Sequence, residues 1–176
     1  MSLSVFQRSQ CVSLIAITSM FSCLNSCSDG SKSSGNVLPS AAQKALQGAD
    51  RFELLSLNPD ELADKTDTDA FHGWNVLGTT EVKDPDTRAN LISRFKAGVA
   101  ENDGTVANCF NPRHGIKVTH DGETHEFVIC FECFSVEWHV DGQETKGFLI
   151  TRSPQPTFDE ILKESGVLLA GEAKPE

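Results

Sequence analysis

The densest group of potentially reactive side chains lies in two short segments of the C-terminal half. The first segment reads Cys109-Phe110-Asn111-Pro112-Arg113-His114-Gly115, and the second reads Ile129-Cys130-Phe131-Glu132-Cys133. Thiols and imidazoles form disulfides, bind zinc and act as nucleophiles. We therefore expect any chemistry of this chain to be located in these two segments.

A structural disulfide is the first interpretation of the cysteines. In an oxidising compartment Cys109 would pair with Cys130 or Cys133, and the bond would tie the loop that begins at Cys109 to a strand. One thiol is left over once a single bridge has formed. The spacing alone does not indicate which cysteine stays free.

Zinc binding is the second interpretation. Cys109, His114, Cys130 and Cys133 provide three thiolates and one imidazole, and the Cys-x₂-Cys spacing occurs in zinc sites. Residues three apart in a regular strand point to opposite faces, so both thiols reach one ion only if a bulge near Glu132 redirects them. The Cys-x₄-His spacing of the first segment is also unusual for zinc.

Redox or nucleophilic chemistry at a free thiol is the third interpretation. A reactive Cys-x-x-Cys pair commonly begins at a helix N-terminus, where the helix dipole lowers the thiol pKa. Cys130 and Cys133 lie instead beside apolar strand residues. Either cysteine could form a nucleophile pair with His114. Unpaired buried thiols would simply fill the core.

Arg113 is a candidate ligand contact. Its guanidinium could bind an anionic group, and His114 beside it could act as a base or ligand. The alternative is a turn before a strand, in which Arg113 pairs with an acid and His114 bonds to backbone. The sequence contains no glycine-rich phosphate loop, nucleophile elbow or HExxH motif. We assign no catalytic residue and favour a non-catalytic role.

The pattern CFxPRHGI followed by ICFxC resembles a family of uncharacterised exported bacterial proteins and lipoproteins. The residues that carry this resemblance are 109–116 and 129–133, and a looser likeness covers roughly residues 71–168. The resemblance implies export and a shared fold. It implies no activity and no catalytic residue.

The N-terminal segment predicts export. Arg8 is the single charged side chain of residues 1–26, and residues 12–24 form an uncharged, mostly apolar run of about 13 residues. That run is shorter than the roughly 20 residues that a membrane-spanning helix needs, and it suits a signal peptide. Leu24-Asn25-Ser26-Cys27 resembles a bacterial lipobox, although Asn25 is larger and more polar than usual. The segment that ends at Cys23 matches less well.

We therefore predict that Cys27 is lipidated and that the chain is a membrane-anchored lipoprotein, with secretion without lipid as the alternative. Ser28, in place of the aspartate that retains lipoproteins at an inner membrane, favours the outer membrane or periplasmic face in a diderm host. Residues 1–26 form the predicted signal peptide, and residues 27–39 form a lipidated cysteine with a Ser/Gly-rich tether. One domain is expected over residues 40–170, followed by a disordered tail at 171–176.

The charge balance excludes one class of partner. The chain has 15 Lys and Arg against 25 Asp and Glu, a net charge of −10 at pH 7. Nucleic-acid binding needs a cationic surface to contact phosphates, so we predict no nucleic-acid partner. The expected partners are the membrane, through the lipid, and an unidentified protein or small molecule. No cofactor is expected, although zinc is possible.

Local patterns predict an α+β fold, with an antiparallel sheet of about five or six strands and two or three helices packed on one face. Helices are expected at 40–47, from Asp84 to about residue 103, and after a capping box at 157–160. Strands are expected at 51–57 and 71–82, and around the Asp-Gly turns at 121–122 and 141–142. The apolar phase shifts by one residue between 127–131 and 134–140, which predicts a bulge or tight turn near Cys133.

The function that follows from the sequence is an exported, lipid-anchored envelope protein with a non-catalytic binding or structural domain. Two alternatives remain open: a lipoprotein that binds metal through Cys109, His114, Cys130 and Cys133, and a small thiol-dependent enzyme.

Overall fold

The computed structural model describes residues 36–64 and 66–171. The predicted signal peptide, Cys27 and the residues after 171 lie outside this part. The described helices are α1 (Ser40–Gln47), α2 (Pro85–Glu101) and α3 (Gln155–Glu164). The described strands are β1 (Arg51–Leu62), β2 (Trp74–Glu81), β3 (His114–His120), β4 (Glu123–Cys130), β5 (Ser135–Val140), β6 (Gln143–Glu144) and β7 (Phe148–Leu149).

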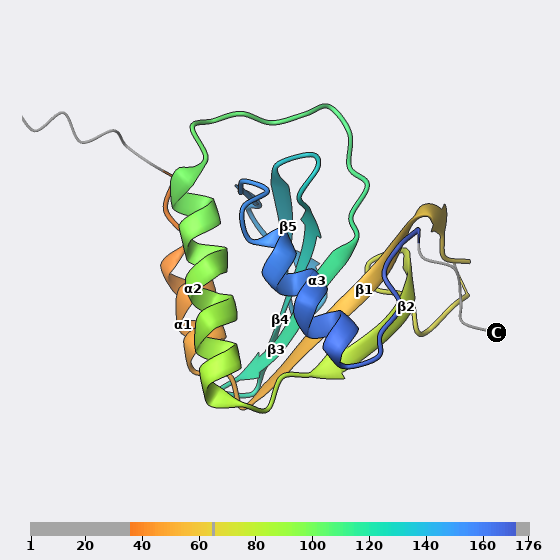
Figure 1. Ribbon diagram of the computed structural model, residues 1–176, viewed down its shortest axis with the longest axis horizontal. Helices are drawn as coiled ribbons and strands as arrows, with labels where there is room; N and C mark the ends of the chain where they lie inside the picture. Colours follow the sequence, from red (N-terminus) through yellow and green to blue (C-terminus); the bar gives the residue numbers. More distant parts are fainter. Residues whose placement is uncertain (1–35, 65, 172–176) are drawn as a thin grey trace, which may run out of the picture. The chain divides into compact units, whose positions relative to one another are not determined.

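The strands of the described residues form one antiparallel sheet of seven strands, in the order β2-β1-β3-β4-β5-β6, with β7 also paired to β5. Helices α1, α2 and α3 lie over the same side of this sheet (Figure 1). The predicted α+β fold is confirmed. The described sheet has seven strands, where about five or six were predicted. Among the described helices, none is long and apolar enough to cross a membrane.

Helix α2 begins where the sequence predicts. The Asp84 side chain accepts a hydrogen bond of 2.7 Å from the backbone N–H of Thr87, and Pro85 occupies the first helical position. The capping carboxylate satisfies a backbone donor that lacks a partner within the helix, and proline has no donor to lose there. The buried face of α2 includes Leu91, Phe95 and Val99.

The Asp-Gly pairs at 121–122 and 141–142 form tight turns that connect neighbouring strands. Asp121 and Gly122 have φ values of 51° and 84°, and Asp141 and Gly142 have values of 49° and 75°. Two successive residues with positive φ define the hairpin turn whose twist matches that of the flanking strands. These turns place β3 against β4 and β5 against β6, as predicted.

A four-residue turn, 131–134, joins β4 to β5 and is the phase correction that the sequence predicts near Cys133. Cys130 pairs with Ser135 on either side of this turn, and Phe134 within it has a φ of 58°. As a result Ile129 and Val136 are partners on one face. Both are buried in the core under the helices.

Two predicted boundaries are wrong. Strand β1 continues past Asn58-Pro59 to Leu62, because an irregularity in its pairing with β2 between Asn58 and Leu62 accommodates the proline. Helix α3 begins at Gln155, so Thr157 lies inside its first turn and is not the N-cap. Prolines 154 and 156 preset the backbone for that earlier start.

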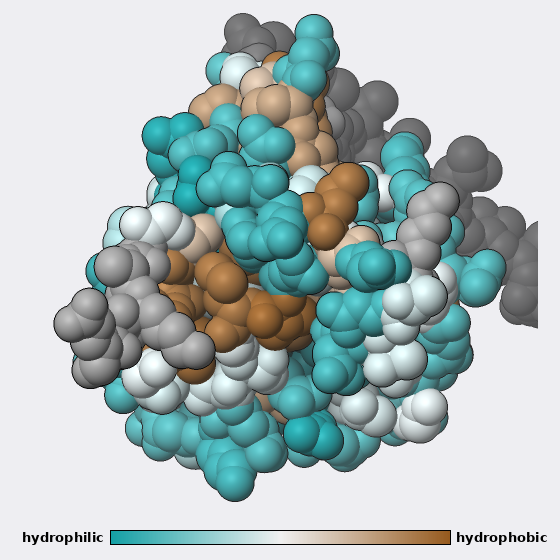
Figure 2. Space-filling view, turned by 90° about the vertical axis from the view of Figure 1, so that its right-hand side faces the viewer, coloured by the Kyte–Doolittle hydropathy of each residue, from teal (hydrophilic) through white to brown (hydrophobic). Residues whose placement is uncertain are grey.

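The two faces of the sheet differ in character. The face under the helices carries the main core, which includes Phe52, Leu54, Ile116, Phe127 and Trp138. The opposite face carries a small apolar cluster of Leu55, Leu57, Phe71 and Val128 together with charged side chains. Figure 2 shows that apolar side chains also gather on the surface at one side of the molecule, surrounded by hydrophilic groups.

Leu91→Ala is expected to lower the free energy of unfolding by about 3–5 kcal/mol, because it removes a fully buried side chain and leaves a cavity. Leu62→Ala, at a leucine that is 67% exposed, is the matched control and should change the stability by less than about 0.5 kcal/mol. Urea unfolding followed by circular dichroism measures both values. Equal losses in the two variants would contradict the placement of α2 over the core.

Candidate functional site

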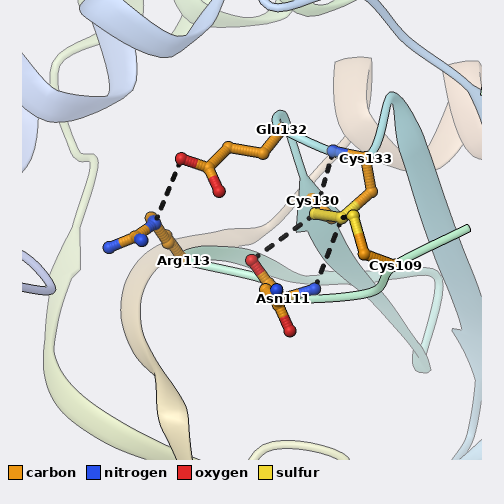
Figure 3. Close-up of a disulfide and its surroundings, with 6 residues drawn as sticks. All are labelled: Cys109, Asn111, Arg113, Cys130, Glu132 and Cys133. Carbon is orange, nitrogen blue, oxygen red and sulfur yellow. Dashed lines mark hydrogen bonds and ion pairs between the residues drawn. A yellow bond between two sulfur atoms is a disulfide. The ribbon is translucent and has the colours of Figure 1, made fainter. Parts of the chain in front are cut away.

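Cys130 and Cys133 are joined by a disulfide across the turn between β4 and β5 (Figure 3). Cys130 is the last residue of β4, and Cys133 lies in the turn that follows. The turn brings their Cα atoms to 5.2 Å from each other, a separation within the range of ordinary disulfides. Both cysteines are fully buried.

Cys109 lies in the loop between α2 and β3 and is the free cysteine of the described residues. Its Sγ atom is 2.8 Å from the Sγ atom of Cys133, and the residue is exposed to solvent. The sequence favoured a bridge from Cys109 to Cys130 or Cys133. The structure instead pairs the latter two and places Cys109 in contact with the bridge, because the tight turn brings Cys133 back beside Cys130.

Backbone hydrogen bonds hold the Cys109 loop against the turn. The N–H of Ala107 donates to the carbonyl oxygen of Cys133 at 3.1 Å. The N–H of Asn111 donates to the Cys133 Sγ atom at 3.4 Å, and the Asn111 carbonyl oxygen lies 3.4 Å from the Cys130 Sγ atom. The three sulfur atoms therefore form one cluster whose loop side is anchored on both sides of Cys109.

His114 lies on the opposite face of the sheet from Cys130. It pairs in register with Ile129, whose side chain points toward the helices, whereas Cys130 is the next residue along β4 and points the other way. The His114 ring packs against Phe131 and Phe158, and its Nε2 atom is 2.8 Å from the Asp159 Oδ1 atom. His114 thus contacts α3 and not the sulfur cluster.

This placement separates the predicted Cys₃His set. The nucleophile pairs of His114 with Cys130 or Cys133 are not formed, since both thiols are used in a disulfide and the imidazole bonds to Asp159. Within residues 36–64 and 66–171, no group of three or more His, Cys, Asp or Glu side chains is arranged to hold a metal ion. Zinc binding by these four residues stays a prediction that the geometry does not favour.

Arg113 directly precedes β3, and its side chain extends toward Glu132 in the turn after β4 (Figure 3). Its Nε atom is 3.9 Å from the Glu132 carboxylate, and its Nη1 atom donates to the Ala170 carbonyl oxygen at 3.5 Å. Both contacts are long, and about a third of the side chain is exposed. A small pocket of about 180 Å³ is lined here by Arg113, His114, Glu132, Gln155, Asp159, Leu169 and Ala170.

A second polar group occupies the sheet face away from the helices. Glu53, Lys117, Glu126 and His139 are successive partners across β1, β3, β4 and β5, so their side chains form one row. His72, from the loop before β2, donates through Nε2 to the Glu126 Oε2 atom at 3.0 Å and stacks on His139 with ring centres 3.7 Å apart. Lys117 contacts the other Glu126 oxygen at 3.0 Å.

These contacts determine the ionisation of Glu126. The hydrogen bond from His72, supported by Lys117, lowers the pKa of the Glu126 carboxyl to about 2 against the opposing effect of burial. Burial lowers the pKa of His139, and the neighbouring His72 charge acts in the same direction. The row therefore holds a buried carboxylate between Lys117 and His72 and disfavours a charge on the stacked His139.

Three residues of these sites were missed in the sequence. Asp159 was interpreted as part of a capping box, and its contact with His114 joins residues 45 positions apart. Glu126 and His72 are 54 positions apart and meet through the fold. Lys117 and Glu126 lie equally far from the Asp121-Gly122 turn, on its two sides. This spacing was the signal that could have predicted their pairing across the hairpin.

The comparisons with known proteins provide no relative of this chain: no family model, no curated protein and no solved structure matches it. The resemblance to exported proteins with CFxPRHGI and ICFxC segments stays a prediction.

Glu126→Gln is expected to destabilise the fold by on the order of 2 kcal/mol at pH 7. The native pKa of Glu126, about 2, is below its ordinary value of 4.5. The stabilisation is therefore fully present above about pH 4.5 and is lost as the pH falls toward 2. Urea unfolding of both proteins from pH 7 to pH 2 measures this difference.

Glu137→Gln is the matched control on the same face. Burial raises the pKa of Glu137, with the charge of Glu144 adding to the effect, so its ionised form gains nothing from folding. This substitution should not destabilise the protein at pH 7. A stability difference for Glu126→Gln that is the same at pH 7 and pH 2 would rule out the ion-pair explanation.

Proposed function

We propose that this chain is an exported envelope protein, anchored by a lipid on Cys27, whose folded domain has a binding or structural role. The observation that carries the proposal is the order of the N-terminal segments. A short apolar run and a lipobox-like Leu24–Cys27 precede a Ser/Gly-rich stretch, and the folded domain follows, with Leu38 already buried in its core. This order suits a lipoprotein whose domain is held away from a membrane.

The composition after Cys27 is consistent with that role. Residues 28–35 are rich in Ser and Gly, as linkers often are. The predicted tether is shorter than residues 27–39, because Leu38 is buried in the core and the Asn36 side chain donates to Asn102. A diacylglycerol together with an acyl chain provides more than one lipid anchor, which stable membrane attachment requires. The cysteine pair at bonding distance, Cys130 and Cys133, is compatible with an oxidising compartment outside the cytoplasm.

The surroundings of His114 do not suit a histidine that activates a nucleophile. A histidine that activates a nucleophile bonds to that nucleophile through one ring nitrogen and to an orienting group through the other. His114 has the orienting carboxylate, Asp159, but its buried Nδ1 atom has no hydrogen-bond partner among the described residues. In the part of the chain that the structure describes, no nucleophile is bonded to His114.

We assign the ligand contact of the domain to Arg113. Its guanidinium has two long contacts and lines the small pocket together with Gln155 and Asp159. A pocket of about 180 Å³ has room for a single polar group of a larger partner. A carboxylate that displaces Glu132 would form the short, charge-assisted bonds that Arg113 now lacks.

Cys27→Ala in the full-length chain is expected to abolish incorporation of labelled palmitate and to move the protein from the membrane fraction to the soluble fraction. Cys23→Ala is the matched control, because it alters the weaker lipobox candidate in the same apolar segment. This control should retain both the label and the membrane location. The measurements are metabolic labelling and fractionation of cells that express each variant.

Retention of label by Cys27→Ala together with its loss in Cys23→Ala would move the anchor to Cys23. Export of the wild-type chain without label would leave simple secretion. Retention of the protein in the cytoplasm would contradict the proposed export altogether.

A further inference from the structure

The sulfur cluster combines an exposed thiol with a buried disulfide. Cys109 is accessible to solvent, whereas Cys130 and Cys133 are fully buried. The Cys109 Sγ atom is 2.8 Å from the Cys133 Sγ atom, which is one end of the bond. Exchange between thiols and disulfides proceeds by attack of a thiolate on one sulfur of the disulfide. The attacking and the attacked atoms are therefore already in contact.

We propose that Cys109, Cys130 and Cys133 form a thiol–disulfide exchange centre. The Cys109 thiol loses its proton to solvent, and the thiolate attacks the Cys133 Sγ atom. The Cys109–Cys133 bond forms while the Cys130–Cys133 bond breaks, and Cys130 leaves as a thiolate that takes up a proton. One disulfide and one thiol are present before and after the step, so the exchange needs no oxidant or reductant.

The surrounding backbone favours this step. The N–H of Cys133 donates to the Cys130 Sγ atom at 3.1 Å, and such a bond stabilises negative charge on a leaving thiolate. The N–H of Asn111 donates to the Cys133 Sγ atom, the atom under attack. The bond between Ala107 and Cys133 holds the loop so that Cys109 stays beside the disulfide. These three contacts keep the Cys109 thiol beside the sulfur atom that it attacks.

Exchange changes what the cluster presents to solvent. Before the step the free thiol is exposed at Cys109, and afterwards the free thiol is buried at Cys130. The new bond also ties the loop between α2 and β3 covalently to the turn after β4. The exposed sulfur of Cys109 is then part of the disulfide, and thiols from outside can attack it.

The substrate class that follows is a dithiol. One thiolate of the dithiol attacks the Cys109 Sγ atom, a mixed disulfide forms, and Cys133 leaves as a thiolate. The second thiol of the dithiol then closes its own disulfide and releases Cys109. The dithiol is oxidised, and the protein disulfide is reduced to two thiols. This activity goes beyond the proposed binding role and does not depend on the lipid anchor.

Disulfide mapping of the oxidised protein tests the exchange directly. The full-length chain with Cys11, Cys23 and Cys27 replaced by Ser retains the three cysteines of the cluster. The protein is incubated at pH values from 6 to 9, quenched with acid, alkylated and digested, and the pairs are identified by mass spectrometry. We expect both Cys130–Cys133 and Cys109–Cys133, reaching a constant ratio faster at higher pH because the thiolate is the nucleophile. One pairing alone at every pH, of either kind, would overturn the proposal.

The rate of reduction by dithiothreitol provides a second test. In the native wild-type protein, Cys109 attacks the buried disulfide within the same molecule and then offers its exposed sulfur to dithiothreitol. In native Cys109→Ser, dithiothreitol must attack the buried disulfide directly, so we expect reduction to be slower by at least about tenfold. In denaturing urea the same substitution should have no effect, which is the control for the chemistry of the reductant. Circular dichroism establishes that the variant is folded. Equal reduction rates of the two native proteins would overturn the relay through Cys109.

Discussion

Alternation of side chains along the strands decides which reactive groups of this protein can meet. His114 and Ile129 share one face, and Cys130, one residue further along β4, belongs to the other. Because Cys130 follows the partner of His114 by one residue, its side chain and the His114 imidazole lie on opposite faces of the sheet. The four-residue turn after Cys130 then returns the chain so that Cys133 comes back to Cys130 and meets Cys109. The sulfur cluster and the His114–Asp159 pair are two sites because of that alternation.

The same constraint gives the two faces of the sheet different tasks. Helices α1, α2 and α3 bury the apolar face, so the stability of the domain comes mainly from that side. The opposite face carries the row that contains Lys117, Glu126 and His139, and the loop before β2 covers part of that row. The buried Glu126 carboxylate is tolerated there because Lys117 and His72 both contact it.

Local signals predicted the elements that depend on a few neighbouring residues. Asp84 with Pro85 determines the start of α2, and the Asp-Gly pairs determine the two hairpins, because their turn geometry requires those residues. The phase shift of apolar residues predicted the turn near Cys133 for the same reason. These features are encoded within a few positions of the chain.

Features that depend on a partner strand or helix were not predicted. The extension of β1 past Pro59 depends on the irregular pairing with β2, and the role of Asp159 depends on His114 across the fold. The choice of disulfide likewise depends on how tightly the turn closes, which the spacing of Cys109, Cys130 and Cys133 does not encode. Residue types selected Cys109, Cys130 and Cys133, which the fold brings together, and His114, which it places with Asp159 on the other face.

The most direct test of the account is an intact native mass spectrum of the exported protein, purified without chelator. A Cys130–Cys133 disulfide predicts a mass lower than that of the fully reduced chain by two hydrogen atoms, with no bound metal and with one alkylatable thiol in the domain. A mass increased by one zinc ion, with the thiols of Cys109, Cys130 and Cys133 all reduced, would contradict the central claim that these cysteines form a disulfide with an adjacent thiol.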